Sequence, residues 1–128
     1  MISVTYSVNK PYSGNRPWAD VTLAPSGAAV TLKCLVDPGA DFLQINALDA
    51  SAAGFSLVGA TPVPISTAAG SATLQKVGAV KVSIEGSKTL TVDVLVDTTN
   101  KTKPALAGRQ LLLAAFDIGF NTSEWLMT

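Results

Sequence analysis

Apolar residues recur at every second position over much of this chain, and that spacing limits what it can fold into. Side chains on a β-strand point alternately to the two faces of the sheet, so the pattern predicts strands with one buried face. Three runs show it: residues 2–8, residues 30–36 and residues 77–96, the last interrupted by Gly86 and Ser87. A Gly-Ser pair between alternating runs is typical of a hairpin turn. The chain is therefore expected to be all-β, or mainly so.

The two ends of the sequence follow the same rule. Residues 2–8 and residues 118–127 both carry apolar side chains at alternate positions. Edge strands readily pair with other strands, so these runs could interleave with a second copy or fold back on their own chain. Pro62 and Pro64 confine the segment around them to an edge or a turn, because proline cannot donate to a β-ladder.

Helical character is limited to short stretches. Residues 106–116 are rich in leucine and alanine, which are strong helix formers, so a helix is expected here. The spacing of Ile45, Leu48 and Ala52 indicates a second, weaker helical face.

The charge balance excludes several classes of partner. Among the 128 residues, Lys and Arg number 9 and Asp and Glu number 9, which gives a net charge of +0. Such a chain has no basic footprint for nucleic acid or for anionic lipid. With hydrophobic residues at 48% it also favours self-association, so an oligomer is expected.

The length and the apolar segments indicate how the chain is organised. Its 128 residues suit a single domain over 1–128. No apolar run reaches the length of a membrane span, and the first residues lack the layout of a signal peptide. We therefore expect no membrane partner and a cytoplasmic location, and the chain could still be excised from a longer precursor.

The absence of histidine narrows the chemistry. There is no imidazole base and no His-ligated zinc, so acid–base work would have to use carboxylates, lysine or tyrosine. The single cysteine, Cys34, excludes an internal disulfide and a cysteine metal cluster. Because Cys34 alternates with Leu32 and Val36, we interpret it as a buried small hydrophobe.

One turn at the end of a predicted strand carries a carboxyl group. Residues 30–36 lead into Asp37, Pro38 and Gly39, and Asp-Pro-Gly is among the commonest turn signals. On its own it would be only a turn. The buried strand before it and the small Gly39 and Ala40 after it would let a ligand backbone come close to the carboxyl group.

Four segments, in order, resemble motifs of the retropepsin-like aspartic proteases. That family carries apolar-apolar-Asp-Thr/Ser-Gly-Ala, a small-residue flap with a central glycine, an apolar strand ending Val-Leu-Val, and Gly-Arg-Asn/Asp-Leu-Leu opening a C-terminal helix. The matching segments here are Leu35 to Asp41, Ser66 to Ser71, Val94 to Val96, and Gly108 to Leu112. Each piece is weak alone, but four in register across roughly residues 30–120 make a strong signal.

The resemblance implies a closed or semi-open β-barrel or sandwich, with a flap hairpin and one short C-terminal helix. It also implies an aspartic endopeptidase active as a homodimer, with a polypeptide substrate and with no metal or cofactor. Each chain would contribute one catalytic aspartate, Asp37, and the pair would hold a water molecule. Two carboxyl groups so close cannot both ionise, so one would act as the base and the other as the acid.

The family pattern also assigns roles beside Asp37. The backbone carbonyl of Gly39 would face the substrate, and Ala40 and Asp41 would hold the substrate main chain. Arg109 would pair with Asp41, a charge-assisted contact that fastens the loop to the helix.

Other positions would bind substrate from the flap and from the pocket walls. Ala69 and Gly70 would lie at the flap tip, where the freedom of glycine lets the flap open and close. Leu35, Pro104 and Leu106 would line side-chain pockets, although plain core is an equally good interpretation of Leu35.

Position 38 departs from the family pattern, which has threonine or serine there. The hydroxyl and N–H of that residue normally hydrogen-bond across the dimer axis, and Pro38 has neither donor. Each such bond is worth about 1 kcal/mol, and two symmetric copies multiply the loss. Gln110, in place of asparagine or aspartate, is a milder change.

Three interpretations of the function therefore remain open. The chain is an active homodimeric endopeptidase, or a retropepsin-like fold that binds peptides or dimerises without cutting them. In the third interpretation it is an unrelated β-sandwich interaction module, in which residues 37–39 are only a turn.

Overall fold

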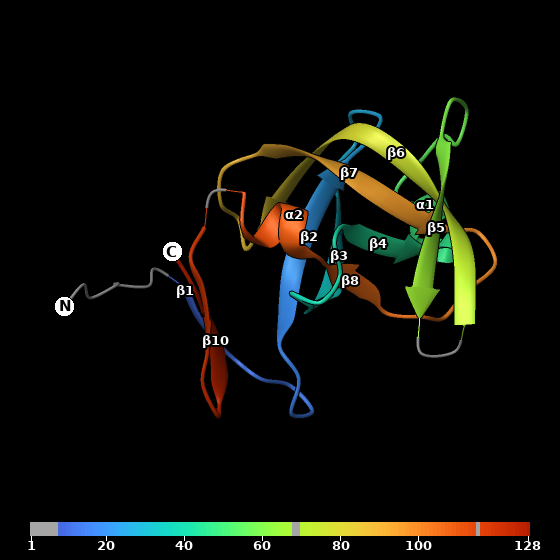
Figure 1. Cartoon of the computed structure of the whole chain (residues 1–128). Helices are drawn as coiled ribbons and strands as arrows, with labels where there is room; N and C mark the ends of the chain where they lie inside the picture. The colour runs from blue at the N-terminus through green and yellow to red at the C-terminus, as the bar shows by residue number, and fades with distance from the viewer. Residues whose placement is uncertain (1–7, 68–69, 115) are drawn as a thin grey trace.

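The computed structural model describes residues 8–67, 70–114 and 116–128 (Figure 1). Most of these residues lie in strands, so the all-β expectation is confirmed. The strands are β1 Val8–Pro11, β2 Trp18–Ala24, β3 Val30–Val36, β4 Leu43–Asn46, β5 Thr61–Thr67, β6 Gly70–Ile84, β7 Leu90–Asp97, β8 Ala105–Ala107, β9 Ile118–Phe120 and β10 Glu124–Met127. Two short helices accompany them: α1 Ala47–Ala52 and α2 Arg109–Leu112.

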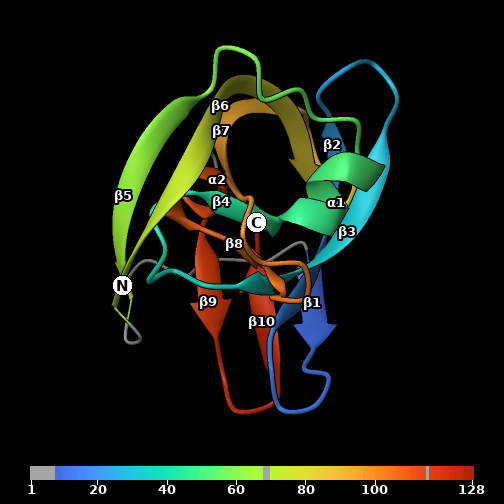
Figure 2. The same cartoon turned by 90° about the vertical axis from the view of Figure 1, so that its right-hand side faces the viewer.

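Six of the described strands close into a barrel (Figure 2). They pair in the order β2-β3-β8-β4-β7-β6, and β6 pairs back onto β2. The β3–β8 and β4–β7 pairings are parallel, and the other ladders of the ring are antiparallel. Alternate side chains fill the interior, among them Val21, Leu43, Val82 and Val94. The period-two pattern thus marks the inward face of the barrel.

A bulge in β6 changes which of its side chains point inward. Val77 lies opposite Val94 and Val80 lies opposite Val92. Over this stretch β6 therefore contains one residue more than β7. Ala79 absorbs the extra residue with a φ of 57°, in the left-handed region. As a result, the inward-pointing residues of β6 are odd-numbered before the bulge, as at Val77, and even-numbered after it, as at Val80.

The bulge leaves Leu74 of β6 on the outer face of the barrel, where Leu95 of β7 also lies. Lys76 lies opposite Leu95 in the ladder, and Leu74 shares their face, because cross-strand partners and alternate residues point the same way. Leu74 and Leu95 are nevertheless only 1% exposed. The strand β5, which pairs with β6 as a hairpin, lies over this face and covers them.

The predicted helix over residues 106–116 is wrong in its extent. Leu106 belongs to β8, which pairs in parallel with β3, and among the described residues of this stretch only the four of α2 are helical. The local preference for helix is outweighed by strand pairing inside the barrel. Gly108 separates the two elements, with an extended backbone at the N-cap of α2.

The second helical face was also misplaced. Ile45 lies in β4 and points into the core, whereas Leu48, in α1, is 58% exposed. The helix begins only after Asn46, whose side-chain oxygen accepts a hydrogen bond from the Asp49 N–H (2.8 Å). That cap fixes the start of α1 at Ala47, two residues beyond Ile45.

The terminal segments form a sheet of their own in the order β1-β10-β9. β10 pairs on both sides with strands of the same chain, so both of its edges are occupied within one copy. The predicted strand over 2–8 lies outside the described residues except for Val8. Trp125 of β10 is fully buried and donates its indole N–H to the Trp18 carbonyl (2.9 Å), which docks this sheet on the barrel.

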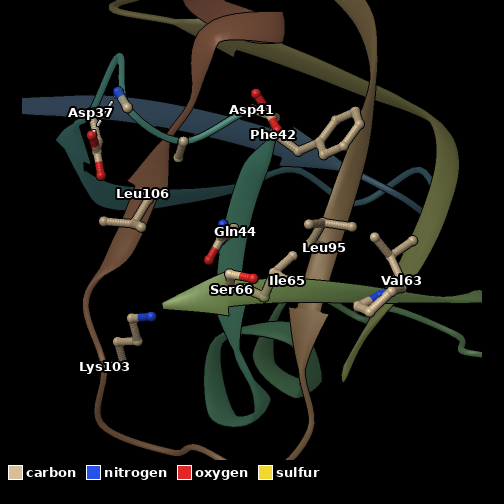
Figure 3. Close-up of a pocket in the computed structure, with 13 residues that line it drawn as sticks. Asp37, Asp41, Phe42, Gln44, Val63, Ile65, Ser66, Leu95, Lys103 and Leu106 are labelled. Atoms are coloured by element: carbon tan, nitrogen blue, oxygen red, sulfur yellow. Dashed lines mark hydrogen bonds between the residues drawn. The ribbon is translucent and has the colours of Figure 1, made fainter. Parts of the chain in front are cut away.

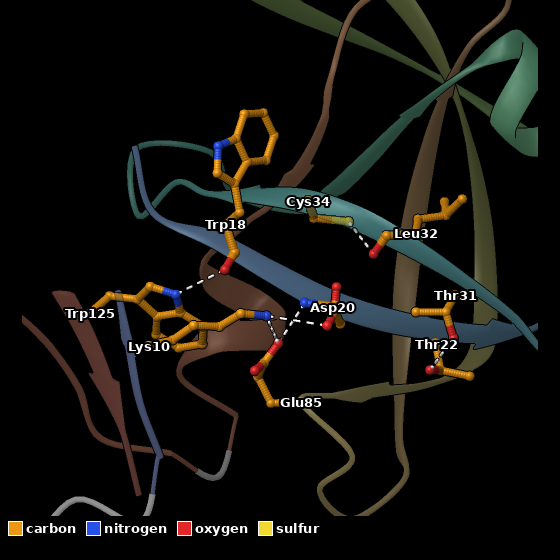
Figure 4. A network of polar contacts seen from close by, with 9 residues as sticks. All are labelled: Lys10, Trp18, Asp20, Thr22, Thr31, Leu32, Cys34, Glu85 and Trp125. Atoms are coloured by element: carbon orange, nitrogen blue, oxygen red, sulfur yellow. Dashed lines mark hydrogen bonds and ion pairs between the residues drawn. The ribbon is translucent and has the colours of Figure 1, made fainter. Parts of the chain in front are cut away.

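A cluster of three charged side chains also joins the terminal sheet to the barrel (Figure 4). The Lys10 ammonium group lies 2.7 Å from Glu85 Oε2 and 3.2 Å from Asp20 Oδ2. Burial alone would lower the pKa of Lys10, but its hydrogen bonds to Glu85 and Asp20 raise that pKa above its ordinary value of 10.5. Because the Asp20 carboxylate is mostly exposed, most of the stabilisation comes from the contact with Glu85.

Replacing Lys10 with methionine keeps the apolar stem and removes the charge. We expect Lys10→Met to lower the free energy of unfolding by about 1–2 kcal/mol, because the Glu85 carboxylate loses its charged donor. Urea unfolding measures the change. Lys81→Met, which removes an exposed ammonium group from β6, serves as the control and should cost much less.

The difference in unfolding free energy between Lys10→Met and the unaltered protein should shrink as the pH rises. A raised folded-state pKa means that the stabilisation is fully present below pH 10.5 and is lost as the pH rises through the raised pKa. The two unfolding free energies should therefore converge at high pH. Divergence with rising pH would contradict the role given to Lys10.

Candidate active site

A pocket of about 480 Å³ opens between the loop that follows β3 and the hairpin strand β5 (Figure 3). The loop supplies Asp37, Gly39, Ala40 and Asp41, and β5 supplies residues 63–66. The remaining lining comes from the strands and loops beneath the hairpin: Phe42, Gln44, Leu95, Lys103 and Leu106. The pocket therefore joins the turn singled out in the sequence to the outer face of the barrel.

The loop after β3 is a β-turn built around the Asp37 carboxyl group. The N–H of Ala40 donates to the Asp37 carbonyl (3.1 Å), and the N–H of Gly39 donates to Asp37 Oδ1 (2.9 Å). The N–H of Asp37 donates in turn to the Ala107 carbonyl of β8 (3.0 Å). Pro38 occupies the second position of the turn, where its fixed φ is favoured. The side chain of Asp37 is thus oriented by its own loop.

The helix α2 holds this loop from behind. The N–H of Arg109 donates to the Ala40 carbonyl (2.8 Å), and the N–H of Gln110 donates to the Asp41 carbonyl (3.0 Å). The Arg109 guanidinium also forms an ion pair with the Asp41 carboxylate, so the structure brings together the two side chains that the sequence paired. Both side chains are more than half exposed, so the ion pair positions the loop more than it stabilises the fold.

The approach of α2 to the loop depends on a missing side chain. A Cβ at position 108 would lie 2.3 Å from the Phe42 carbonyl oxygen and 2.8 Å from its backbone nitrogen. The φ of Gly108 is −89°, which any residue can adopt. Gly108 is therefore required for space, because only glycine lets the two backbones come this close.

A two-point contact ties α2 to β7. Gln110 Oε1 accepts the Asp93 N–H (2.8 Å), and Gln110 Nε2 donates to the Asp93 carboxylate (3.2 Å). The sequence marked Gln110 only as a departure from the family pattern. In the structure, Gln110 connects α2, which binds the Asp37 loop, to β7 in the wall of the barrel.

This geometry, an oriented aspartate beside a hairpin-covered pocket, agrees with a family comparison. The sequence profile of the aspartyl protease family matches residues 20–110, which run from β2 to α2. The chain belongs to this family. The retropepsin-like resemblance and the barrel expected from it are thereby confirmed, and family membership implies a polypeptide substrate. No curated protein sequence matches the chain with significance.

Not all of the other predicted site residues line the pocket. Leu106 lines it, whereas Leu35 lies beside Leu106 in the β3–β8 ladder without lining it. Pro104 lines a smaller cavity, which shares Gln44 and Lys103 with this pocket. Gly70 begins β6 with a φ of 123°, beside the turn of the hairpin. Ala69 lies outside the described residues.

Several lining residues were missed by the sequence reasoning. Val63 and Ile65 alternate along β5, and that alternation is a signal that they share a face. Phe42 directly follows the predicted loop, so its place beside the pocket could have been inferred from the sequence. Leu95 lies within the Val94 to Val96 segment and Lys103 directly precedes Pro104, but the sequence gives neither residue a place in the pocket. The closure of the barrel brings both of them there.

The cysteine takes no part in this site. Cys34 is fully buried in the core, as predicted, and burial raises the pKa of its thiol to about 12. A thiol that stays protonated near neutral pH is a poor nucleophile. Within the described residues, no cluster of three or more acidic or cysteine side chains is placed to bind a metal, and no helix is long and apolar enough to span a membrane.

Gly108→Ala should damage the loop without altering any side chain of the pocket. The added Cβ meets backbone atoms of Phe42, which cannot rotate away, so we expect the free energy of unfolding to fall by about 3 kcal/mol. Urea unfolding measures this loss. Gly78→Ala is the matched control, because its Cβ would meet only the Asp93 carboxylate at 3.3 Å. Equal stability of the two variants would contradict the account.

Proposed function

We propose that the protein is an aspartic endopeptidase that acts as a homodimer, with one Asp37 from each copy in a shared active site. The observation that carries the proposal is the Asp37 carboxyl group, oriented by its own turn at the edge of a pocket in an aspartyl protease barrel. A polypeptide in extended form would lie between the loop and the hairpin.

One chain offers only half of the required chemistry. Two acidic side chains line the pocket, and Asp41 is already paired with Arg109. Hydrolysis by carboxyl groups needs a base for the water and an acid for the carbonyl oxygen at the same time. Since Asp37 cannot serve as both in one step, a second Asp37 must come from a second copy.

The proposed reaction follows from that pair. The ionised Asp37 takes a proton from a water molecule, whose oxygen attacks the carbonyl carbon of the substrate. The protonated Asp37 of the other copy donates its proton to the carbonyl oxygen, which gives a neutral tetrahedral diol. Transfer of a proton to the leaving nitrogen then lets the carbon–nitrogen bond break, and the two carboxyl groups again share one proton.

The neighbouring groups would position the substrate. The Gly39 carbonyl, Ala40 and Asp41 lie on the loop side of the pocket and would hold the main chain, with Leu106 packing against a side chain. The β5–β6 hairpin, with Gly70 beside its turn, would close over the bound peptide.

Pro38 favours a second candidate, a peptide-binding member of the family that does not cut. It removes an N–H and a hydroxyl that would otherwise bridge the dimer, and it is exposed on the loop. In that case the pocket would still accept peptides, but the two Asp37 groups would not meet closely enough to activate water.

The first test removes the charge of Asp37. Asp37→Asn should abolish cleavage of an unfolded protein or a peptide library, while sedimentation shows that the dimer persists. Mixed with the unaltered protein, it should inhibit more than in proportion to its amount, because each mixed dimer is inactive. Residual cleavage by Asp37→Asn alone would refute the assignment.

The second test restores the missing donors. Pro38→Thr should tighten the dimer by about tenfold or more, if each copy regains a bond worth ~1 kcal/mol. Sedimentation measures the dimer dissociation constant. If the unaltered protein never cleaves and Pro38→Thr does, the second candidate function is correct. An unchanged dissociation constant would show that position 38 does not reach the partner.

A further inference from the structure

A lysine without a counter-ion faces the pocket from the loop between β7 and β8. Lys103 is the only basic residue that lines the pocket in the described part of the chain. Its side chain is exposed, and no hydrogen bond or ion pair of its ammonium group is found with the described residues. Figure 3 shows this side chain extending toward Ser66 of the hairpin. A bare positive charge therefore lies where a substrate would bind.

The backbone of Lys103 is held firmly on both sides. Its N–H donates to Asn100 Oδ1 (2.7 Å), and its carbonyl accepts a hydrogen bond from Asn46 Nδ2 (2.8 Å). Asn46 is itself only 8% exposed and caps α1 through its other side-chain atom, which accepts the Asp49 N–H. The base of the lysine is thus fixed before any ligand arrives, and only its side-chain rotamers are ordered on binding.

The acidic groups of the pocket are already engaged. Asp41 is paired with Arg109, and Asp37 accepts the Gly39 N–H and is reserved for water activation in the proposed reaction. Ser66, Leu106 and Gln44 line the same side of the pocket as Lys103, and Gln44 also lines the smaller cavity together with Lys103. The complement of an ammonium group beside a hydroxyl and an apolar side chain is a carboxylate on a short apolar stem.

We propose that Lys103 selects an acidic side chain, aspartate or glutamate, at a substrate subsite bounded by Lys103, Ser66 and Leu106. The proposal rests on the peptidase function and adds the class of substrate to it. The apolar part of the pocket, with Phe42, Val63 and Leu95, takes a neighbouring apolar side chain. By the two-fold symmetry of the dimer, such a subsite lies on each side of the bond to be cut.

The proposal is tested with short fluorescent peptides that carry glutamate, glutamine or lysine at one varied position. The position is scanned along an otherwise apolar peptide, and binding to the Asp37→Asn variant is measured by fluorescence anisotropy. We expect the glutamate peptide to bind about tenfold more tightly than the lysine peptide at one position, equivalent to ~1.4 kcal/mol, and less so at high salt. Cleavage of the same peptides by the active protein should show the same preference.

Charge reversal identifies the residue responsible. In the Asp37→Asn background, Lys103→Glu should reverse the preference toward the lysine peptide. Lys101→Glu is the matched control, because Lys101 is exposed on the same loop, does not line the pocket and gives the same change in net charge. It should leave the preference unchanged.

Two results would overturn the proposal: no charge preference at any position, or the same reversal by Lys101→Glu as by Lys103→Glu. Failure of the peptidase function would look different. If no peptide is cleaved but binding still discriminates through Lys103, the subsite stands and the peptidase function falls. If peptides are cleaved without any charge preference, the peptidase function stands and the role of Lys103 falls.

Discussion

The site depends on the close packing of α2 against the loop that carries Asp37. Two backbone amides, of Arg109 and Gln110, bind the carbonyls of that loop, and Gly108 leaves the space in which they can do so. These are short-range interactions between backbone atoms, so they fix the loop more precisely than the exposed Arg109–Asp41 ion pair could. The Asp37 carboxyl group inherits its position from this contact.

The barrel supplies the other half of the site through an irregularity. The bulge at Ala79 turns the face of β6, which places Leu74 on the outer surface beside Leu95, and the hairpin strand β5 then covers that surface. In a regular β6, Leu74 would share the face of Val80 and Val82 and would point into the barrel. The same closure brings the loop with Lys103 to the pocket, where its ammonium group finds no internal partner among the described residues.

Much of this could be predicted from the sequence, for physical reasons that differ between residues. Period-two alternation reflects which side chains are buried, so most strands and the burial of Cys34 could be predicted from it. The turn at Asp37 and the Arg109–Asp41 contact were predicted from the motifs. The helix at 106–116 did not, because barrel pairing overrides local propensity at Leu106. Alternation breaks at the bulge in β6, so the pattern alone does not locate the extra residue at Ala79. Gln110 and Lys103 were not foreseen because their contacts join segments far apart in the chain.

The central claim is that each polypeptide carries one carboxyl group of a pair, and that catalysis begins only when two copies meet. The most direct measurement is the distance between the two Asp37 carboxyl groups in a crystal structure of the assembled protein. The account predicts that they lie about 3 Å apart or are joined by one bound water molecule. An assembly in which the two groups are too far apart for one water to bridge, or a protein that remains monomeric with full activity, would contradict it.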